Sequence, residues 1–493
     1  MSNVRVRIAP SPSGFLHIGT AKIALMNWLF ARNQGGAFIL RLEDTDAERT
    51  DEAFVQGMCE GFKWLGLDWD EGPPFGDEPE KGDRGPYRQS QRADIHRAAA
   101  QKLLASGHAY RCFCSKEQLD AERAQAEAEK RSWRYSGACR NLTSDQIAAK
   151  GGAPAVVRFK VPGGETIVDD VVQGQVRVKN EQFDDFVIAR ADGSALYHLA
   201  VVVDDIEMGI THILRGDDHL TNASKHVMLF RALGVGPPVF AHLPLVLDER
   251  GKKYSKRDRG ANVLDWRDDG YLPEALINYV VLLGWSEGDD KEVFTRDELI
   301  QAFSLDRLGK SAGRFDLKKF QWLNGQHIRL LPPQELLARL LPILNAAGFD
   351  TASKSLAWLL RMTEICQEKL GTLKDIVGQT DFFFIEPTEY EDRAVKKHWQ
   401  LPDAAARLES IRAALDAVAD WTHDPLKAAI EHLAESHGEK LGAYVHPLRL
   451  ALTGKSVGPG LFELTELLGK PTTLARLDKA SAFIRKYRVE IPT

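Results

Sequence analysis

The alternation of apolar and polar residues predicts that the chain opens with a strand, a turn and a helix. Residues 4–8 place β-branched side chains at every second position, and prolines and a glycine at 10–14 interrupt this strand. Over residues 21–34 apolar side chains recur every three or four positions, which predicts a helix. Backbone N–H groups at a helix start favour an anion such as phosphate, so His17 and Thr20 would stand beside an anion site.

Further apolar segments predict that this unit belongs to a parallel sheet. Residues 37–42 form the next predicted strand, and a strand, a helix and a strand with short connections make a βαβ unit. Ligands bind at the carboxyl ends of the strands in such sheets. Glu43 lies at one of these ends, although capping of the following helix is the alternative for this residue. The same buried-strand composition returns in residues 197–205, 211–219 and 239–247.

The segments between and after these strands have other patterns. Residues 155–190 alternate like strands and indicate an inserted α+β module rather than more of the parallel sheet. From Pro273 the chain is mostly helical, with Pro332-Pro333 as a linker. The predicted fold class is therefore α/β: a split, doubly wound, Rossmann-like parallel-sheet domain with an α+β insertion, followed by an all-α C-terminal region.

Composition narrows the class of protein. The chain has 493 residues, 44% hydrophobic and 27% charged, which indicates a globular protein of about three to five domains. No apolar run approaches a membrane span and the start has no apolar leader, so we expect a cytoplasmic protein without a membrane partner. Five cysteines, an odd number, argue against a disulfide framework. The net charge of −6 weakly disfavours a nucleic-acid partner, although local basic surfaces remain compatible with one.

A basic loop after residue 247 is a second candidate for anion chemistry. It contains Lys252, Lys253 and Lys256, with Ser255 among them. Lysines on a loop can reach a polyphosphate and stabilise negative charge that builds on phosphorus. A solvent-exposed basic turn is the alternative when the loop is considered alone.

Six segments along the chain match motifs of one known family. Two of them resemble the signature motifs of class I aminoacyl-tRNA synthetases: Pro10…His17-Ile18-Gly19-Thr20 and Lys253-Tyr254-Ser255-Lys256-Arg257. The other four are Arg7-Ile8-Ala9-Pro10-Ser11-Pro12, Arg41-Leu42-Glu43-Asp44-Thr45-Asp46, Gly85-Pro86-Tyr87-Arg88-Gln89-Ser90 and Val203-Asp204-Asp205. In this order they resemble glutamyl-tRNA synthetase of the bacterial type, and the resemblance covers nearly the whole chain.

The resemblance implies a glutamate–tRNA ligase that acts in two steps. Glutamate attacks the α-phosphorus of ATP to give glutamyl-adenylate and pyrophosphate, and the glutamyl group is then transferred to the 3′ end of tRNA-Glu. ATP is implied as a substrate together with Mg²⁺. The implied catalytic residues are His17, Lys253 and Lys256. The implied ATP-binding residues are Pro10, His17, Gly19, Thr20, Ser255 and Lys256; Thr20 replaces the second histidine of many class I enzymes, so no histidine role is carried over to it.

A glutamate pocket must match two carboxylates and one ammonium group. Arg7 is unusual in a strand that should be buried, and its guanidinium fork suits a carboxylate; a structural ion pair is the alternative for this residue. Arg215, at the end of another strand, is the second such candidate. Glu43 could pair with the α-amino group. Ser11 and Tyr197 resemble the family's remaining pocket residues.

Three cysteines resemble the zinc site that the family carries in its insertion. Cys112 and Cys114 are separated by one residue, and Cys139 follows after 24 more. Thiolates at this spacing could supply three tetrahedral ligands of a structural Zn²⁺. Tyr135 is a candidate for the fourth ligand, since position 141 is Asn141 rather than a histidine. Three reduced thiols in a small core are the alternative.

The resemblance also divides the chain and names its partners. The expected parts are a split catalytic domain (1–108 and 195–245), an inserted acceptor-end-binding domain (109–194), a stem-contact domain with the lysine loop (246–325) and two helical anticodon-binding subdomains (326–385 and 386–493). The expected partners are tRNA-Glu, L-glutamate and ATP, and a monomer is expected. The alternatives are a glutaminyl-tRNA synthetase, which usually has a β-barrel anticodon region, and a non-catalytic tRNA-binding paralogue.

Overall fold

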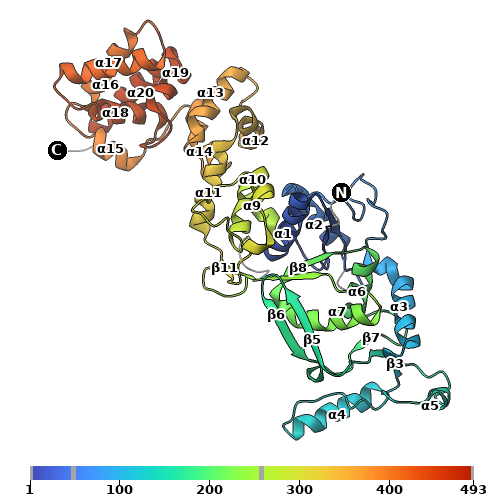
Figure 1. Cartoon of the computed structure of the whole chain (residues 1–493). Coiled ribbons are helices and arrows are strands. Elements are labelled where there is room, and N and C mark those ends of the chain that lie inside the picture. The colour runs from blue at the N-terminus through green and yellow to red at the C-terminus, as the bar shows by residue number, and fades with distance from the viewer. Residues whose placement is uncertain (1–3, 46–50, 255–259, 490–493) are drawn as a thin grey trace. The chain divides into compact units, whose positions relative to one another are not determined.

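The computed structural model of the chain describes residues 4–45, 51–254 and 260–489 (Figure 1). The strands are β1 (Arg5–Ile8), β2 (Ala37–Leu40), β3 (Ala109–Cys112), β4 (Val156–Phe159), β5 (Glu165–Asp170), β6 (Gly174–Lys179), β7 (Val187–Ala189), β8 (His212–Gly216), β9 (Val239–Leu243), β10 (Val246–Leu247) and β11 (Gly313–Arg314). The helices up to residue 302 are α1 (Ile18–Gln34), α2 (Glu52–Trp64), α3 (Ala93–Ala105), α4 (Lys116–Ala128), α5 (Ser144–Ala148), α6 (Tyr197–Glu207), α7 (Leu220–Ala232), α8 (Val263–Asp268), α9 (Pro273–Leu282) and α10 (Arg296–Ala302).

The remaining helices follow in an all-helical stretch. They are α11 (Leu317–Leu330), α12 (Pro333–Ala346), α13 (Leu356–Gln367), α14 (Asp375–Phe384), α15 (Asp392–His398), α16 (Ala404–Asp416), α17 (His423–Ser436), α18 (Gly442–Thr453), α19 (Leu461–Leu468) and α20 (Lys470–Val489). Over the described ranges, no helix combines the length and the apolar character that crossing a bilayer requires.

The chain folds as two compact units. The first comprises residues 1–267 and 276–316, and the second comprises residues 268–275 and 317–493. All the strands of the described chain lie in the first unit, and the second unit is built from helices. The predicted fold class, a split parallel-sheet domain with an insertion and an all-α C-terminal region, is confirmed.

Two pairs of parallel strands form the centre of the first unit. β1 pairs with β2 through the register Arg5–Ala37 to Ile8–Leu40, and β8 pairs with β9. Thr211, just before β8, donates its backbone N–H to the carbonyl of Arg5 at 2.9 Å, so the two pairs lie side by side. The carboxyl ends of β1, β2, β8 and β9 therefore face one region, as a βαβ sheet requires.

The insertion is joined to this sheet more closely than the sequence pattern predicts. β5 and β6 form an antiparallel hairpin, and β5 also pairs in parallel with β9 at Asp170 and Phe240, which gives the strand order β6-β5-β9-β8. Helix α7 packs against β5, and Figure 1 shows it across this sheet. A separate three-stranded sheet, β3-β4-β7, carries the cysteine segment.

The strand that the sequence predicts over residues 197–205 is wrong, because this segment is helix α6. Its residues 199–205 are all buried, so an apolar run covers more than one face of the helix and reads like a buried strand. The strand predicted over residues 239–247 is also interrupted: β9 ends at Leu243 and β10 begins at Val246, with Pro244 between them. Proline has no N–H to donate to a strand ladder, which accounts for the break.

Candidate active site

A cavity of about 800 Å³ lies at the carboxyl ends of the parallel strands. This is the size of a pocket for a cofactor or a substrate pair. It is lined by ten of the residues that the sequence proposes for the site: Arg7, Pro10, Ser11, His17, Gly19, Thr20, Glu43, Tyr197, Arg215 and Lys253. The structure brings these residues together, and their individual roles stay predictions. Ser255 and Lys256 lie outside the described residues.

The start of α1 forms one wall of the cavity. His17 is its N-cap residue, and its Nδ1 accepts a hydrogen bond from the backbone N–H of Gly19 at 3.0 Å. A Cβ at Gly19 would approach the same Nδ1 to 3.1 Å, so glycine keeps this turn close to the ring. Because Nδ1 accepts, the neutral ring carries its proton on Nε2. The wall therefore places the start of a helix, where the helix dipole favours an anion, beside an imidazole donor.

A carboxylate network surrounds Arg7 at the end of β1. Its Nε and Nη2 donate to Oδ1 and Oδ2 of Asp205 at 3.0 and 3.2 Å. Arg41, fully buried, donates from Nη1 to Oδ1 of the same carboxylate at 2.7 Å, and its Nη2 lies 3.5 Å from Oε1 of Glu43. Burial opposes ionisation of Asp205, but Arg7 and Arg41 outweigh it and hold its pKa below the usual range. The ion pair considered as an alternative for Arg7 thus exists, alongside its place in the cavity wall.

Glu43 lies at the edge of this network, and its charge is less well compensated by the arginines than that of Asp205. Burial, opposed by Arg41 and Arg7, leaves the pKa of Glu43 above its ordinary value. Its backbone N–H donates to the carbonyl of Pro10 at 3.0 Å, which fixes it against the turn after β1. A carboxylate in this position gains from a cation that enters the cavity.

Arg215 has a different environment, although it lines the same cavity. Its side chain is buried, and among the residues that the structure describes no carboxylate lies within ion-pair distance of its guanidinium. Its Nε donates to Nε2 of His242 at 3.0 Å, its Nη1 is 3.2 Å from Nδ1 of His226, and its Nη2 donates to the carbonyl of His219 at 3.4 Å. Burial lowers the pKa of Arg215 to about 10, and the group remains a cation at neutral pH. A buried, charged and uncompensated guanidinium is a receptor for an anion.

Tyr197 and His219 complete the wall beside Arg215. The hydroxyl of Tyr197 lies 3.1 Å from Nδ1 of His219. Burial, followed by the charge of Glu43, raises the pKa of Tyr197 to about 12, so it stays a neutral hydrogen-bonding group. His219 lies in the segment after β8 and was not singled out from the sequence.

Lys22 is a further cavity residue that the sequence pattern did not reveal. Its Nζ donates to the carbonyl of Pro244 at 2.8 Å and lies 3.4 Å from that of Leu283. Burial lowers its pKa to about 8, opposed by Asp217. Its position in the helical pattern of α1 falls on a buried face, and a lysine on an apolar face is the signal that could have found it.

Lys253 is the described member of the basic loop that reaches the cavity. Its exposed Nζ lies 3.1 Å from Oδ2 of Asp218. Surface ion pairs of this kind contribute little to stability, so Lys253 can exchange Asp218 for another anion at small cost.

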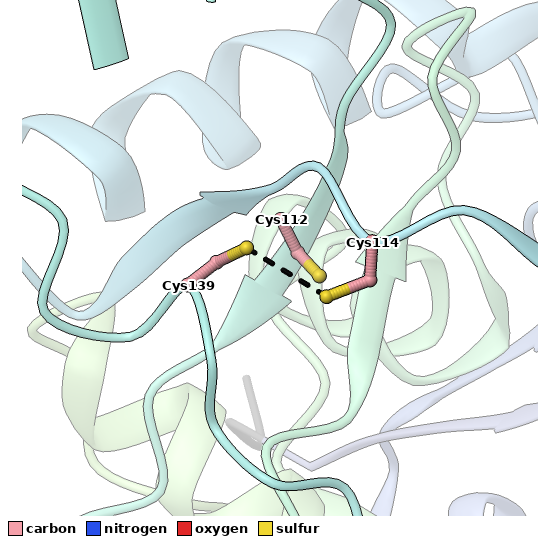
Figure 2. A group of neighbouring side chains, drawn as sticks. All are labelled: Cys112, Cys114 and Cys139. Carbon is pink, nitrogen blue, oxygen red and sulfur yellow. Dashed lines mark hydrogen bonds between the residues drawn. The ribbon is translucent and has the colours of Figure 1, made fainter. Parts of the chain in front are cut away.

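The three predicted zinc ligands lie together in a second site, at the end of β3 and in the loops after it. Figure 2 shows the Sγ atoms of Cys112, Cys114 and Cys139 directed toward one another. These atoms all lie within 4.8 Å of one another, and those of Cys114 and Cys139 are 3.7 Å apart. Tetrahedral zinc with bonds of 2.3 Å requires sulfur separations of about 3.8 Å. The donor set therefore fits the ion.

Tyr135 closes this cluster from a fourth direction. Its hydroxyl lies 3.2 Å from Sγ of Cys112 and 3.9 Å from Sγ of Cys114. The guanidinium of Arg158 stacks on its ring at 3.8 Å, which adds positive charge beside the thiols. Cys59 and Cys366 are buried and lie outside the cluster.

Comparison with known proteins identifies the class of this chain. The family model described as tRNA synthetases class I (E and Q), catalytic domain, matches residues 3–322, and the model of an anticodon binding domain matches residues 335–481. The first unit and its cavity are thus those of a class I tRNA synthetase.

Individual relatives define the family within that class. The glutamate–tRNA ligase 1 of Syntrophomonas wolfei is 43% identical over 495 residues, covering 100% of this chain and 99% of its own length. That of Alkalilimnicola ehrlichii is 44% identical over 98% of this chain and 99% of its own length. A crystal structure of a glutamate tRNA ligase from Elizabethkingia meningosepticum, in complex with its amino acid, has a TM-score of 0.88 at 35% identity and covers 98% of this chain and 100% of its own. The chain belongs to the glutamate–tRNA ligase family, which confirms the resemblance of its sequence motifs.

Proposed function

We propose that the cavity binds L-glutamate and ATP and joins them as glutamyl-adenylate, whose glutamyl group then passes to the 3′ end of tRNA-Glu. The observation that carries this proposal is Arg215, a buried cation that no described carboxylate neutralises. It lies in one cavity with the start of α1, where phosphates are favoured. An amino acid with an anionic side chain and a nucleotide are therefore accommodated side by side.

The proposed contacts to glutamate follow from the charges of the wall. Arg215 takes one carboxylate of the substrate, and Arg7, with Ser11, takes the other. Glu43, whose pKa is raised by burial, binds the α-ammonium group, which restores a counter-charge to its carboxylate. Tyr197 supplies a neutral hydroxyl to the same pocket.

The proposed activation step needs positioning and charge stabilisation only. A carboxylate oxygen of glutamate attacks the α-phosphorus of ATP, the bond to the bridging oxygen breaks, and pyrophosphate leaves. His17, Gly19, Thr20 and the start of α1 hold the phosphates, with Pro10 shaping the turn; Mg²⁺ accompanies ATP as its counter-ion. Lys253, together with Lys256 and Ser255 of the signature loop, stabilises the charge that develops on the leaving group.

The signature loop offers a matched test of this step. In Lys256→Ala, glutamate-dependent ATP–pyrophosphate exchange in the presence of tRNA should fall by about two orders of magnitude, since one preorganised donor contributes about 3 kcal/mol. Lys252→Ala, in the same loop, is the control and should retain exchange. Equal activity of the two variants, with tRNA binding intact, would remove Lys256 from the mechanism.

We also propose that Cys112, Cys114, Cys139 and Tyr135 hold a structural Zn²⁺. The fit of the donor set supports this, and the ion would supply the charge that binds three thiolates in one small core. Metal analysis of protein purified without chelators should find about one equivalent, and Cys139→Ser should lose it while Cys59→Ser retains it. Less than about a tenth of an equivalent in the wild type contradicts the site.

The roles proposed for the remaining parts follow the family. Residues 109–194 would contact the acceptor end of the tRNA, residues 246–325 its stem, and residues 326–385 and 386–493 the anticodon. A cytoplasmic monomer is proposed for the whole, which fits five cysteines that the structure leaves unpaired. Light scattering after size-exclusion chromatography, with and without tRNA, tests the monomer.

A further inference from the structure

A chain of hydrogen-bonded polar groups passes through Arg215, and its other members do not line the cavity. All of them are buried except His198, which is half-buried. The chain of groups begins at Asp170, the last residue of β5, passes through His242 on β9 and Arg215 on β8, and continues through His226 on α7 to His198 on α6. Arg215 and His242 are direct partners in the register of β8 and β9. No step of the proposed reaction uses these histidines, and both His226 and His242 are fully buried.

The hydrogen bonds fix the protonation state of both rings. A guanidinium has donors only, so Nε2 of His242 and Nδ1 of His226 must accept from Arg215, at 3.0 and 3.2 Å. The proton of His242 is then on Nδ1, which lies 2.6 Å from Oδ2 of Asp170. That of His226 is on Nε2, which lies 3.2 Å from Nδ1 of His198. Both rings are therefore neutral, because a doubly protonated ring has no acceptor to offer.

The surroundings stabilise these neutral states. Burial, and then the charge of Arg215, lowers the pKa of His226 well below its ordinary value. Burial also lowers the pKa of His242, although its hydrogen bond to Asp170 opposes this. Asp170 accepts hydrogen bonds from the backbone N–H of His242 at 3.0 Å and from the ring of the same residue. Its carboxylate therefore bonds His242 and does not contact the guanidinium of Arg215 directly.

The same geometry leaves part of the guanidinium for a ligand. Three of its five N–H groups bond His242, His226 and the carbonyl of His219. Within the described part of the chain no other acceptor bonds these nitrogens, so one N–H on each Nη remains. Two such groups on adjacent nitrogens match the two oxygens of a carboxylate.

We propose that His226 and His242 are positioning residues that hold Arg215 by neutral acceptors only, and that this neutrality gives the pocket its selectivity for an anionic side chain. The inference rests on the proposed function, and within it on binding of the side-chain carboxylate of glutamate by Arg215, since glutamine lacks that carboxylate. A carboxylate in place of either ring would orient the guanidinium equally well but would neutralise it. The substrate would then lose its counter-charge, and the uncharged glutamine would be disfavoured less.

Substitution of His226 by Asn, Leu or Asp, whose side chains are similar in size, separates two effects on Arg215: the orientation of its guanidinium and the neutralisation of its charge. In His226→Asn, Oδ1 replaces Nδ1 as a neutral acceptor, in His226→Leu the acceptor is absent, and in His226→Asp it is anionic. Each is assayed by tRNA-dependent ATP–pyrophosphate exchange with glutamate and with glutamine, and the KM for ATP and the melting temperature are recorded. The asparagine variant should keep the glutamate KM within about threefold of wild type, because it conserves the hydrogen bond.

The other two variants should raise the glutamate KM about tenfold or more while kcat and the KM for ATP change little, because a hydrogen bond to a charged group is lost in one and the cation is neutralised in the other. Only His226→Asp should also narrow the preference for glutamate over glutamine. Where a His226 variant fails to fold, the set His242→Gln, His242→Leu and His242→Glu repeats the test, since Gln places Oε1 near the position of Nε2.

The outcomes separate this inference from the function on which it rests. A wild-type protein that does not exchange with glutamate overturns the proposed function and the inference with it. If the wild type is active but His226→Asn and His226→Asp have the same glutamate KM and the same preference for glutamate over glutamine, the inference alone is overturned. The neutrality of the acceptor would then have no effect. A rise in the KM for ATP equal to that for glutamate in the leucine variant also overturns it, because it reports a general distortion.

Discussion

Two regions of the same cavity hold buried arginines in opposite ways. At the ends of β1 and β2, Arg7 and Arg41 share the carboxylate of Asp205, with Glu43 close to Arg41. At the end of β8, Arg215 is held by two histidine rings and a carbonyl, and no described carboxylate pairs with it. All these guanidinium groups are buried, so they differ in compensation and not in exposure.

Because the arginines of one region are compensated by carboxylates and Arg215 is not, we expect the two regions to contribute differently to stability and to substrate binding. A compensated ion pair gains little net free energy from a further anion, but the removal of one partner leaves an uncompensated buried charge. An uncompensated cation costs stability in the empty protein and recovers it when an anion binds. The first region should therefore govern the stability of the first unit, in addition to its proposed contacts with glutamate through Arg7 and Glu43. The second region should govern affinity for the substrate and contribute little to stability.

The largest expected effect comes from removing the uncompensated cation. In Arg215→Met, the kcat/KM for glutamate in tRNA-dependent exchange should fall at least about 100-fold, because charge-assisted hydrogen bonds to the substrate are lost. The melting temperature should change little, since loss of the hydrogen bonds to the histidines is offset by loss of a buried charge. A decrease of less than about fivefold in kcat/KM would show that the uncompensated charge of Arg215 does not bind the substrate.

The reciprocal change in the first region should act on stability. Asp205→Asn leaves Arg7 and Arg41 without their shared anion and should lower the free energy of unfolding of the first unit by about 3–5 kcal/mol. Urea denaturation followed by tryptophan fluorescence measures it. The control is Asp94→Asn, whose exposed pair with Arg97 should contribute less than about 1 kcal/mol. Equal losses in the two variants would show that the network around Asp205 does not stabilise the fold.

A smaller effect is expected from pH. Burial lowers the folded-state pKa of a set of histidines: His198, His212, His219, His226 and His242. The unfolded chain therefore binds more protons than the folded one below the ordinary histidine pKa of about 6.5. Their contribution to stability is complete above that pH and is lost as the pH falls toward 4, the approximate folded pKa of His198.

Thermal melts between pH 7.5 and 5 measure this effect. The melting temperature should fall below about pH 6.5, and the fall should be smaller in His226→Asn, which removes one titrating ring of the second region. A melting temperature that is constant or rises over this range contradicts the neutral state of the rings around Arg215.

The sequence predicts much of the fold because the local patterns agree with the tertiary structure. The alternation in residues 4–8 is β1, the period of three to four in residues 21–34 is most of α1, and the C-terminal helical pattern is the second unit. The pattern fails over residues 197–205, where burial on several faces erases the difference between a helix and a strand. It also does not predict that β5 joins β9, because the partner of a strand is a tertiary property.

The residues of the site also fall into those that the sequence predicts and those that it does not. The sequence indicates Arg7 and Arg215 because each is a charged residue in an apolar strand. The family motifs indicate most of the other residues that line the cavity. The same signal is present at Lys22, His226 and His242, which lie in apolar elements. What the sequence lacks is the partner of each group: that Arg7 meets Asp205 across 198 residues, whereas Arg215 meets two histidines, requires the folded chain.

A crystal structure of the protein with glutamate bound would show whether Arg215 receives the substrate. We expect the side-chain carboxylate of glutamate with its two oxygens about 2.7–3.2 Å from Nη1 and Nη2 of Arg215. His226 and His242 should keep their hydrogen bonds to the same guanidinium, and Asp205 should remain on Arg7. A glutamate whose carboxylates both lie away from Arg215 would contradict the claim that this uncompensated cation selects the substrate.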